Sequence, residues 1–291
     1  MPFDNQQVDV SGVDDRRGRS IGGLGSMPIA IGGGGGIVGL IVIILFNVLS
    51  SQLGGSHPAA TDTYSTAAPA SSLAQRCNVS GAIEQYDDCY VVKSYNEINE
   101  VWDAQLGVRY EHPQLVFFEQ AAQTGCGNAS SNVGPFYCPA DQSIYIDLGF
   151  LAELQKRFGA NGRYAQTYIV AHEAGHHIQH LAGADRLAAN ARDSAGQQRI
   201  SIGTELQADC YAGVWSTQAN RRGNYSIGEA ELNEALNAAA AVGDDRIQAK
   251  TQGRVDPESW THGSAQQRHD AFLTGYRAGT LEACASLLPT R

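Results

Sequence analysis

The sequence predicts an α+β fold that is mainly α-helical, in one large domain preceded by one transmembrane helix. Three observations predict it. Helical apolar patterns dominate the chain after residue 75, only short stretches alternate as strands do, and residues 29–49 contain no charged side chain. The 291 residues therefore divide into an N-terminal part of distinct composition and a part long enough to form its own core.

Six segments after residue 75 are typical of helices. They are 94–106, 148–157, 168–180, 204–215, 226–242 and 264–278. Gly213 is the weak position in the fourth segment, and the last one opens with the capping-box pattern Ser264-x-x-Gln267. Helices therefore supply most of the predicted core, with room for a small sheet between them.

A short strand is predicted just before the third helix. Within 134–147, Ile144 and Ile146 alternate with Tyr145 and Asp147. Peptide substrates commonly bind by adding a strand to the edge of a sheet, so this segment is a candidate substrate-binding edge. A purely structural strand accounts for the pattern equally well.

The helix 168–180 carries the zincin motif H-E-x-x-H in His172, Glu173 and His176. Histidines four residues apart share a helical face, so both rings can reach one zinc ion at about 2.0–2.1 Å. A chance match is expected about 0.01 times in such a chain. As ordinary core residues, the two histidines and the glutamate would need buried polar partners. The motif therefore predicts a zinc site in which Glu173 acts on the attacking water.

Catalytic zinc usually has three protein ligands and one open position, so the motif requires a third ligand. The longer motif H-E-x-x-H-x-x-G-x-x-H does not match, because Gln179 stands at its glycine and Ala182 at its last histidine. Glu205 follows His176 by 29 positions (205 − 176) on the next predicted long helix. We therefore predict Glu205 as the third ligand.

Asp209 lies four residues after Glu205 and shares its helical face. We expect its carboxylate to accept the free N–H of a ligand histidine and so fix the tautomer of that ring. A solvated acidic helix face is the alternative for this pair. Two further histidines compete for the metal: His177 points about 100° away from His176, whereas His180 is closer in phase.

Three segments of the chain resemble the bacterial Putative neutral zinc metallopeptidase family. They are 168–179, 205–215 and the later Thr261-His-Gly-Ser264, and the similarity extends from the N-terminal apolar segment to the C-terminus. The resemblance implies a gluzincin-like peptidase with Zn²⁺ as cofactor. It implies His172, His176 and Glu205 as metal ligands and Glu173 as general base.

Hydrolysis of a peptide bond also benefits from a donor that stabilises the developing oxyanion. His262 is the best candidate, because it lies in a loop immediately before the helix that opens at Ser264. Tyr211 and His269 are weaker candidates. A loop histidine that makes only a local hydrogen bond is the alternative reading of His262.

The N-terminal part predicts a membrane anchor. Residues 1–28 are polar and contain Arg16, Arg17 and Arg19, residues 29–49 match the roughly 20 apolar residues that span a bilayer, and residues 50–74 have a linker composition. The arginines precede the apolar segment, which predicts a cytoplasmic N-terminus. The metallopeptidase domain, 75–291, would then lie in the periplasm or outside the cell, on a single-pass protein of the cell (inner) membrane. A cleaved signal peptide is the alternative.

All six cysteines follow the apolar segment, which fits a domain outside the cytoplasm. Six cysteines allow 15 pairings. Cys77 with Cys89 and Cys126 with Cys138 could each close a small loop, which leaves Cys210 with Cys284 to join the C-terminal tail to the Glu205 helix. A free Cys210, or Cys210 as a zinc ligand, is the alternative.

The formal net charge of −10 and the lack of a basic stripe argue against a nucleic-acid partner. The sequence instead predicts a membrane-anchored zinc peptidase that acts on a peptide or protein substrate. A zinc-stabilised scaffold or binding module of the cell envelope is the second hypothesis. The two differ at Glu173, for which a scaffold has no use, and at the number of protein ligands, since a structural site needs four.

Overall fold

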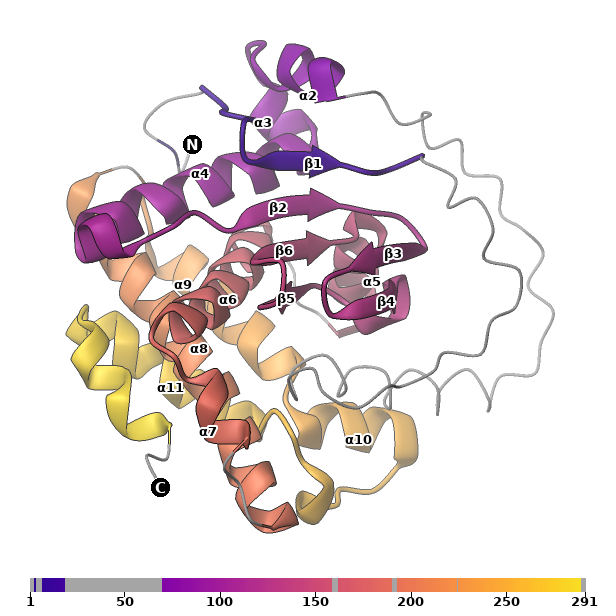
Figure 1. Cartoon of the computed structure of the whole chain (residues 1–291), viewed down its shortest axis with the longest axis vertical. Helices are drawn as coiled ribbons and strands as arrows, with labels where there is room; N and C mark the ends of the chain where they lie inside the picture. The colour runs from indigo at the N-terminus through magenta and orange to yellow at the C-terminus, as the bar shows by residue number, and fades with distance from the viewer. Residues whose placement is uncertain are drawn as a thin grey trace, which may run out of the picture.

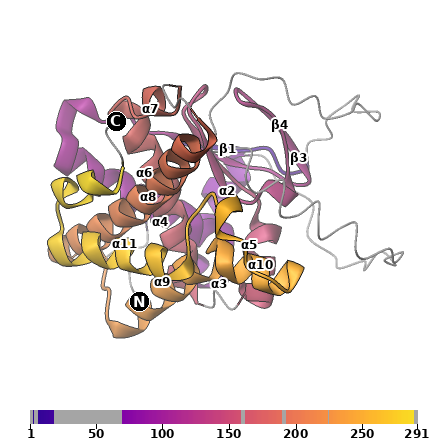
Figure 2. The same cartoon turned by 90° about the horizontal axis from the view of Figure 1, so that it is seen from below.

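Ten α-helices and six strands make up the part of the chain that the structure, a computed structural model, describes: residues 3, 7–18, 70–158, 162–189, 193–223 and 225–288. The helices are α2 (Ala70–Cys77), α3 (Ala82–Gln85), α4 (Asp87–Leu106), α5 (Leu148–Phe158), α6 (Arg163–Leu181), α7 (Asp185–Ala189), α8 (Ser194–Arg222), α9 (Glu229–Ala241), α10 (Asp244–Gln252) and α11 (Ala265–Ala278). Helix α6 packs against α4, α8 and α9, and α8 packs against α11 (Figures 1 and 2). The predicted mainly helical α+β class is confirmed.

The strands form two small sheets. The larger has the order β1 (Val13–Asp15), β2 (Gln114–Phe117), β6 (Ser143–Ile146), β5 (Phe136–Cys138), in which β5 alone runs antiparallel to its neighbour. The smaller is a hairpin of β3 (Ala121–Thr124) and β4 (Gly127–Ser130). Helix α6 contacts β5 and β6, so the larger sheet lies along the helix that carries the H-E-x-x-H motif (Figure 1).

Strict alternation of side chains explains why the sheet has two buried faces. Leu115 and Phe117 of β2, with Ile144 and Ile146 of β6, join the main core under the helices. The residues between them, such as Val116 and Tyr145, join a second cluster under the β3–β4 hairpin. The alternation predicted at 144–147 is therefore real, and both faces are covered.

Each predicted helix is present, although the observed ends differ from the predicted ones by up to ten residues (204 − 194). The first begins seven residues earlier than predicted, at Asp87, and the fourth extends in both directions to form the 29-residue α8. The capping box at the start of α11 is formed by Ser264 and Gln267. Helix α10 and strand β2 were not predicted, because each is too short to show a clear period.

The predicted start of the domain at residue 75 is wrong. Strand β1, which we had assigned to a separate cytoplasmic segment 1–28, pairs with β2 inside the domain, and α2 already begins at Ala70 within the predicted linker 50–74. The boundary was misplaced because Val13 and its neighbours contribute to the core through tertiary contacts, which local composition does not reveal.

The predicted transmembrane segment 29–49 lies outside the described residues. Among the helices that the structure describes, none combines the length and the apolar character needed to cross a bilayer.

All three predicted disulfides are present, and no cysteine is free. Cys77–Cys89 joins α2 to α4, and Cys126–Cys138 joins the hairpin to β5. Cys210–Cys284 joins α8 to the C-terminal 3-10 helix Leu281–Leu287, next to the helix turns that carry Glu205 and Asp209.

Candidate metal centre

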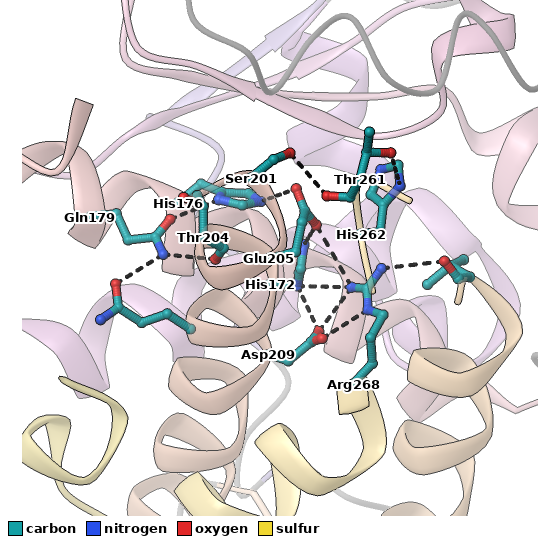
Figure 3. A network of polar contacts seen from close by, with 12 residues as sticks. His172, His176, Gln179, Ser201, Thr204, Glu205, Asp209, Thr261, His262 and Arg268 are labelled. Atoms are coloured by element: carbon teal, nitrogen blue, oxygen red, sulfur yellow. Dashed lines mark hydrogen bonds and ion pairs between the residues drawn. The ribbon is translucent and has the colours of Figure 1, made fainter. Parts of the chain in front are cut away.

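Helices α6 and α8 bring the three predicted metal ligands together. One ligand atom from each of His172, His176 and Glu205 lies within 4.8 Å of the others. Nε2 of His172 is 3.2 Å from Oε2 of Glu205, and Nε2 of His176 is 3.6 Å from Oε1 of Glu205. The carboxylate therefore faces both imidazoles across the packed helices (Figure 3).

Both histidines are oriented by hydrogen bonds at their other ring nitrogen. Nδ1–H of His172 donates to Oδ1 of Asp209 (2.8 Å), and Nδ1–H of His176 donates to Oε1 of Gln179 (2.9 Å). Gln179 is held in turn, because its amide donates to the carbonyl of Thr204 (2.8 Å). With the proton kept on Nδ1, each Nε2 is directed toward Glu205 with its lone pair available to a metal ion.

Arg268 of α11 completes this arrangement beside Asp209, and its Nη2 lies 3.4 Å from Nδ1 of His172 and 4.0 Å from Oε2 of Glu205. Its Nε donates to Oδ2 of Asp209 (2.8 Å) and its Nη2 to Oδ1 (2.9 Å), and the hydroxyl of Tyr168 also donates to Oδ1. Arg268 and Asp209 are both buried. Asp209 is thus fixed by three donors and keeps the negative charge that holds the His172 ring.

The charges of the group fit a divalent cation. Burial disfavours protonation of His172, yet the carboxylates of Asp209 and Glu205 outweigh it and raise the pKa of this imidazole to about 10. Burial likewise opposes ionisation of Glu205, yet His176 and His172 outweigh it and hold the pKa of Glu205 well below its usual range. Two histidines and a carboxylate are ordinary zinc ligands, and a bound dication would replace the imidazolium proton.

Glu173 lies beside the first ligand on the same helix, and it is buried to about the same extent as the ligands. Burial raises the pKa of its carboxyl group, although His172 and His176 oppose the shift. Glu173 is therefore a buried carboxyl group next to the ligand group, and it is not one of the three predicted ligands.

His262 lies in a loop fixed to the metal centre. Oδ2 of Asp244 accepts the backbone N–H groups of Thr261 and His262 (2.6 Å each), and Oδ1 of Asp244 lies 3.2 Å from Nδ1 of His262. Ser201 of α8 donates to the carbonyl of Thr261 (2.9 Å). Ser201 lies four residues before Glu205 on α8, so this hydrogen bond holds the loop of His262 beside the ligand group (Figure 3).

The other candidate residues, which are His177, His180, His269 and Tyr211, have partners outside the ligand group. His177 is buried with both ring nitrogens engaged, by the hydroxyl of Tyr137 (2.9 Å) and a backbone carbonyl, and burial lowers its pKa to about 4. His180, the competing ligand, contacts Asp185 instead. His269 contacts Asp270, and Tyr211 packs edge-on against Trp102.

The predicted substrate edge needs a correction in detail. The alternating residues 144–146 lie on β6, which is an interior strand between β2 and β5. The edge is β5, which comes from the same segment 134–147 and packs against α6 through Tyr137 and His177. Its outer side is not paired with another of the named strands.

Three residues of the site were not predicted: Gln179, Asp244 and Arg268. Gln179 lies three residues after His176 and so shares its face, which is a signal that the sequence offers. Asp244 follows Gly243 at the end of a predicted helix, and Arg268 lies on a helix without any local sign of its partner. Only the packing of α11 against α8 places Arg268 beside Asp209.

A histidine pair on one helix and a glutamate from the helix packed against it form a buried group that could hold a metal ion, and their side chains are ordinary zinc ligands. The chain belongs to the Putative neutral zinc metallopeptidase family, whose model matches residues 3–287. This confirms the resemblance seen in the sequence, and Zn²⁺ is the cofactor that the family implies.

Relatives of the chain occur in distant bacteria. It is 39% identical over 284 residues to "Uncharacterized protein YpfJ" of Escherichia coli K12, and the aligned region covers 94% of each chain. It is 43% identical over 233 residues to "Uncharacterized protein Rv2575" of Mycobacterium tuberculosis H37Rv, which covers 77% of this chain and 78% of that one. No solved structure gives a significant match to this chain.

Proposed function

We propose that this protein is a zinc-dependent peptidase that hydrolyses peptide bonds with Glu173 as general base. The observation that carries the proposal is the ligand group itself: two histidines and one glutamate, with a second, uncommitted glutamate beside them on the motif helix. This is the ligand count of a catalytic zinc site, which keeps one position open.

The alternative, a zinc-stabilised scaffold, would need a fourth protein ligand. The three candidates for that role are engaged elsewhere. Cys210 forms a disulfide with Cys284, His180 contacts Asp185, and Asp209 is bound to His172 and Arg268. These contacts favour the peptidase over the scaffold.

A bound zinc ion would act as a Lewis acid and would lower the pKa of the water molecule bound to it to about 7. Glu173 takes a proton from the attacking water and delivers a proton to the leaving amine. His262 donates a hydrogen bond to the developing oxyanion, and Asp244, whose Oδ1 lies 3.2 Å from Nδ1, orients the ring. The substrate adds as a strand to the outer edge of β5, beside α6.

We place the domain outside the cytoplasm, in the periplasm or at the cell exterior, because its three disulfides need an oxidising compartment. Membrane attachment through residues 29–49 and a peptide or protein substrate are parts of the same proposal. The negative net charge of the chain argues against a nucleic-acid partner.

The test is digestion of a diverse peptide mixture by the purified zinc-loaded protein, with products identified by mass spectrometry. We expect cleavage by the native protein and a loss of rate of about 100-fold or more in Glu173→Gln, the range for removal of a general base. Zinc content, measured by elemental mass spectrometry, should be the same in both. A zinc-loaded native protein that cleaves no peptide, or an equally active Glu173→Gln variant, would contradict the proposal.

A further inference from the structure

The N-terminal residues before the apolar segment are built into the folded domain. Strand β1 pairs in parallel with β2, where the N–H of Leu115 donates to the carbonyl of Gly12 and the N–H of Arg16 donates to the carbonyl of Phe117 (2.9 Å each). The side chains of Val8 and Val13 are buried in the main core. Strand β1 thus covers the edge of β2, while β5 forms the opposite edge beside the metal centre.

Two asparagines hold the extended backbone that leads into β1. The amide of Asn78 accepts the N–H of Val8 (3.0 Å) and donates to its carbonyl (3.1 Å). The amide of Asn96 does the same for Asp9, at 2.9 Å in both directions. Each asparagine thereby satisfies both backbone groups of one residue, as a neighbouring strand would.

Charged and aromatic groups hold both ends of the segment. Nη2 of Arg17 lies 2.6 Å from Asp15 and 2.9 Å from Asp88, which is 71 positions away on α4. At the other end, the ring of Phe3 packs on Tyr225, with ring centroids 4.7 Å apart. The ammonium of Lys93, ion-paired with Glu97 and almost fully buried, lies 5.8 Å from the same ring. Removal of the segment would expose this ion pair and leave Asp88 without one of its two arginine partners.

Two of the three arginines that predicted a cytoplasmic N-terminus, Arg16 and Arg17, have partners in the domain. Nη1 of Arg16 donates to the carbonyl of Gln123 (3.0 Å), and Arg17 is ion-paired with Asp88. These contacts account for the two arginines without any role in orienting a membrane segment. The family model also includes this part of the chain, since its match begins at residue 3.

The hydrogen bonds of β1 restrict how the chain can cross a membrane. A single crossing between residues 18 and 70 would put β1 and β2 on opposite sides of a hydrocarbon layer about 30 Å thick. Their backbone groups are 2.9 Å apart. Two crossings would need about 40 apolar residues, whereas the apolar run 29–49 has 21 (49 − 29 + 1).

We infer that residues 7–18 lie on the same side of the membrane as the metallopeptidase domain, where Val13–Asp15 form an edge strand of its larger sheet. A chain with its N-terminus in the cytoplasm and its domain outside could not form the sheet order β1-β2-β6-β5. This inference replaces the orientation predicted from the positive-inside rule, and it does not depend on peptidase activity.

The test is the accessibility of single added cysteines in the full-length protein, since all native cysteines are paired. Ser11→Cys, at an exposed position before β1, is compared with Val108→Cys, at a fully exposed position of the domain. Spheroplasts are treated with a membrane-impermeant maleimide before or after lysis, with a cytosolic thiol protein as control. Gln7→Cys, also exposed, serves as a second probe if the turn at Ser11 tolerates no substitution.

We expect the N-terminal and domain probes to be labelled to the same extent without lysis. Labelling of both only after lysis would still put them on one side, although it would contradict the extracytoplasmic placement of the domain. Labelling of Val108→Cys before lysis and of both N-terminal probes only after lysis would overturn the inference.

Discussion

Arg268 helps to hold His172, one of the two predicted ligand histidines. Its Nε and Nη2 donate to Asp209, which in turn binds Nδ1 of His172, and its Nη2 also lies 3.4 Å from that Nδ1 and 4.0 Å from Oε2 of Glu205. Asp209 is completely buried, so its charge depends on this partner. The sequence pointed to Asp209 as an orienting carboxylate, but it could not show what keeps that carboxylate ionised and in place.

Replacement of Arg268 by Gln should weaken zinc binding about 10- to 100-fold, the usual effect of removing a partner of a ligand. It should also lower the free energy of unfolding by about 3–5 kcal/mol, because a buried charge loses its counterion. Competition with a chelator and urea unfolding measure the two effects. Arg277→Gln, at an exposed position of the same helix, is the control. Zinc affinity equal to that of the control would remove Arg268 from the metal centre.

At the scale of elements, the contact between α8 and α11 positions Arg268, and two glycines make that contact possible. A Cβ atom on Gly275 would lie 1.8 Å from the carbonyl oxygen of Cys210, and one on Gly213 would lie 2.1 Å from that of Phe272. In the sequence Gly213 looked like a weak point of its helix. In the structure it is a position where the backbone of α11 approaches α8 closely.

Gly275→Ala should therefore destabilise the protein, although alanine favours an isolated helix by about 1 kcal/mol over glycine. Separation of the two helices should cost about 1–3 kcal/mol in the free energy of unfolding, as overpacking usually does. Urea unfolding measures it. Thr274→Ala, at the adjacent exposed position, should change stability by less than about 0.5 kcal/mol. A stabilised Gly275→Ala variant would show that the two helices are not in close contact.

At the scale of the whole molecule, the metal centre links three parts of the fold. The ligands come from α6 and α8, the partner of Asp209 comes from α11, and His262 comes from the loop fixed by α10. A metal ion bound only to the folded state stabilises all of them together. The added stability depends on the ratio of the free zinc concentration to the dissociation constant.

Removal of zinc should lower the melting temperature. At 1,000 times the dissociation constant, zinc contributes about 4.1 kcal/mol, and a domain of this size shifts by about 2–4 °C per kcal/mol. Chelation should thus lower the melting temperature by roughly 8–16 °C, as measured by calorimetry. Glu205→Ala, which lacks a ligand, should melt at the same temperature with and without chelator. An equal shift in both proteins would contradict Glu205 as a ligand.

The sequence by itself determined what depends on local spacing. His172 and His176 four residues apart, Glu205 and Asp209 four residues apart, the capping box of α11 and the alternation of 144–147 each lie within one element. In such cases the helical or strand period fixes which side chains share a face. The pairing of the six cysteines was also found, because two of the pairs close short loops and leave only one remaining pair.

Only the tertiary structure decided which distant segments meet. It places Arg268 beside Asp209, Asp244 beneath the loop of His262, and β1 next to β2, although Val13 and its partner Leu115 are 102 positions apart (115 − 13). Arg17 looked like a membrane signal because one of its acidic partners, Asp88, lies 71 positions away and can be recognised only when the chain is folded. The physical reason is that periodicity records the face a residue occupies on its own element, whereas the partner across that face is selected by packing and charge in three dimensions.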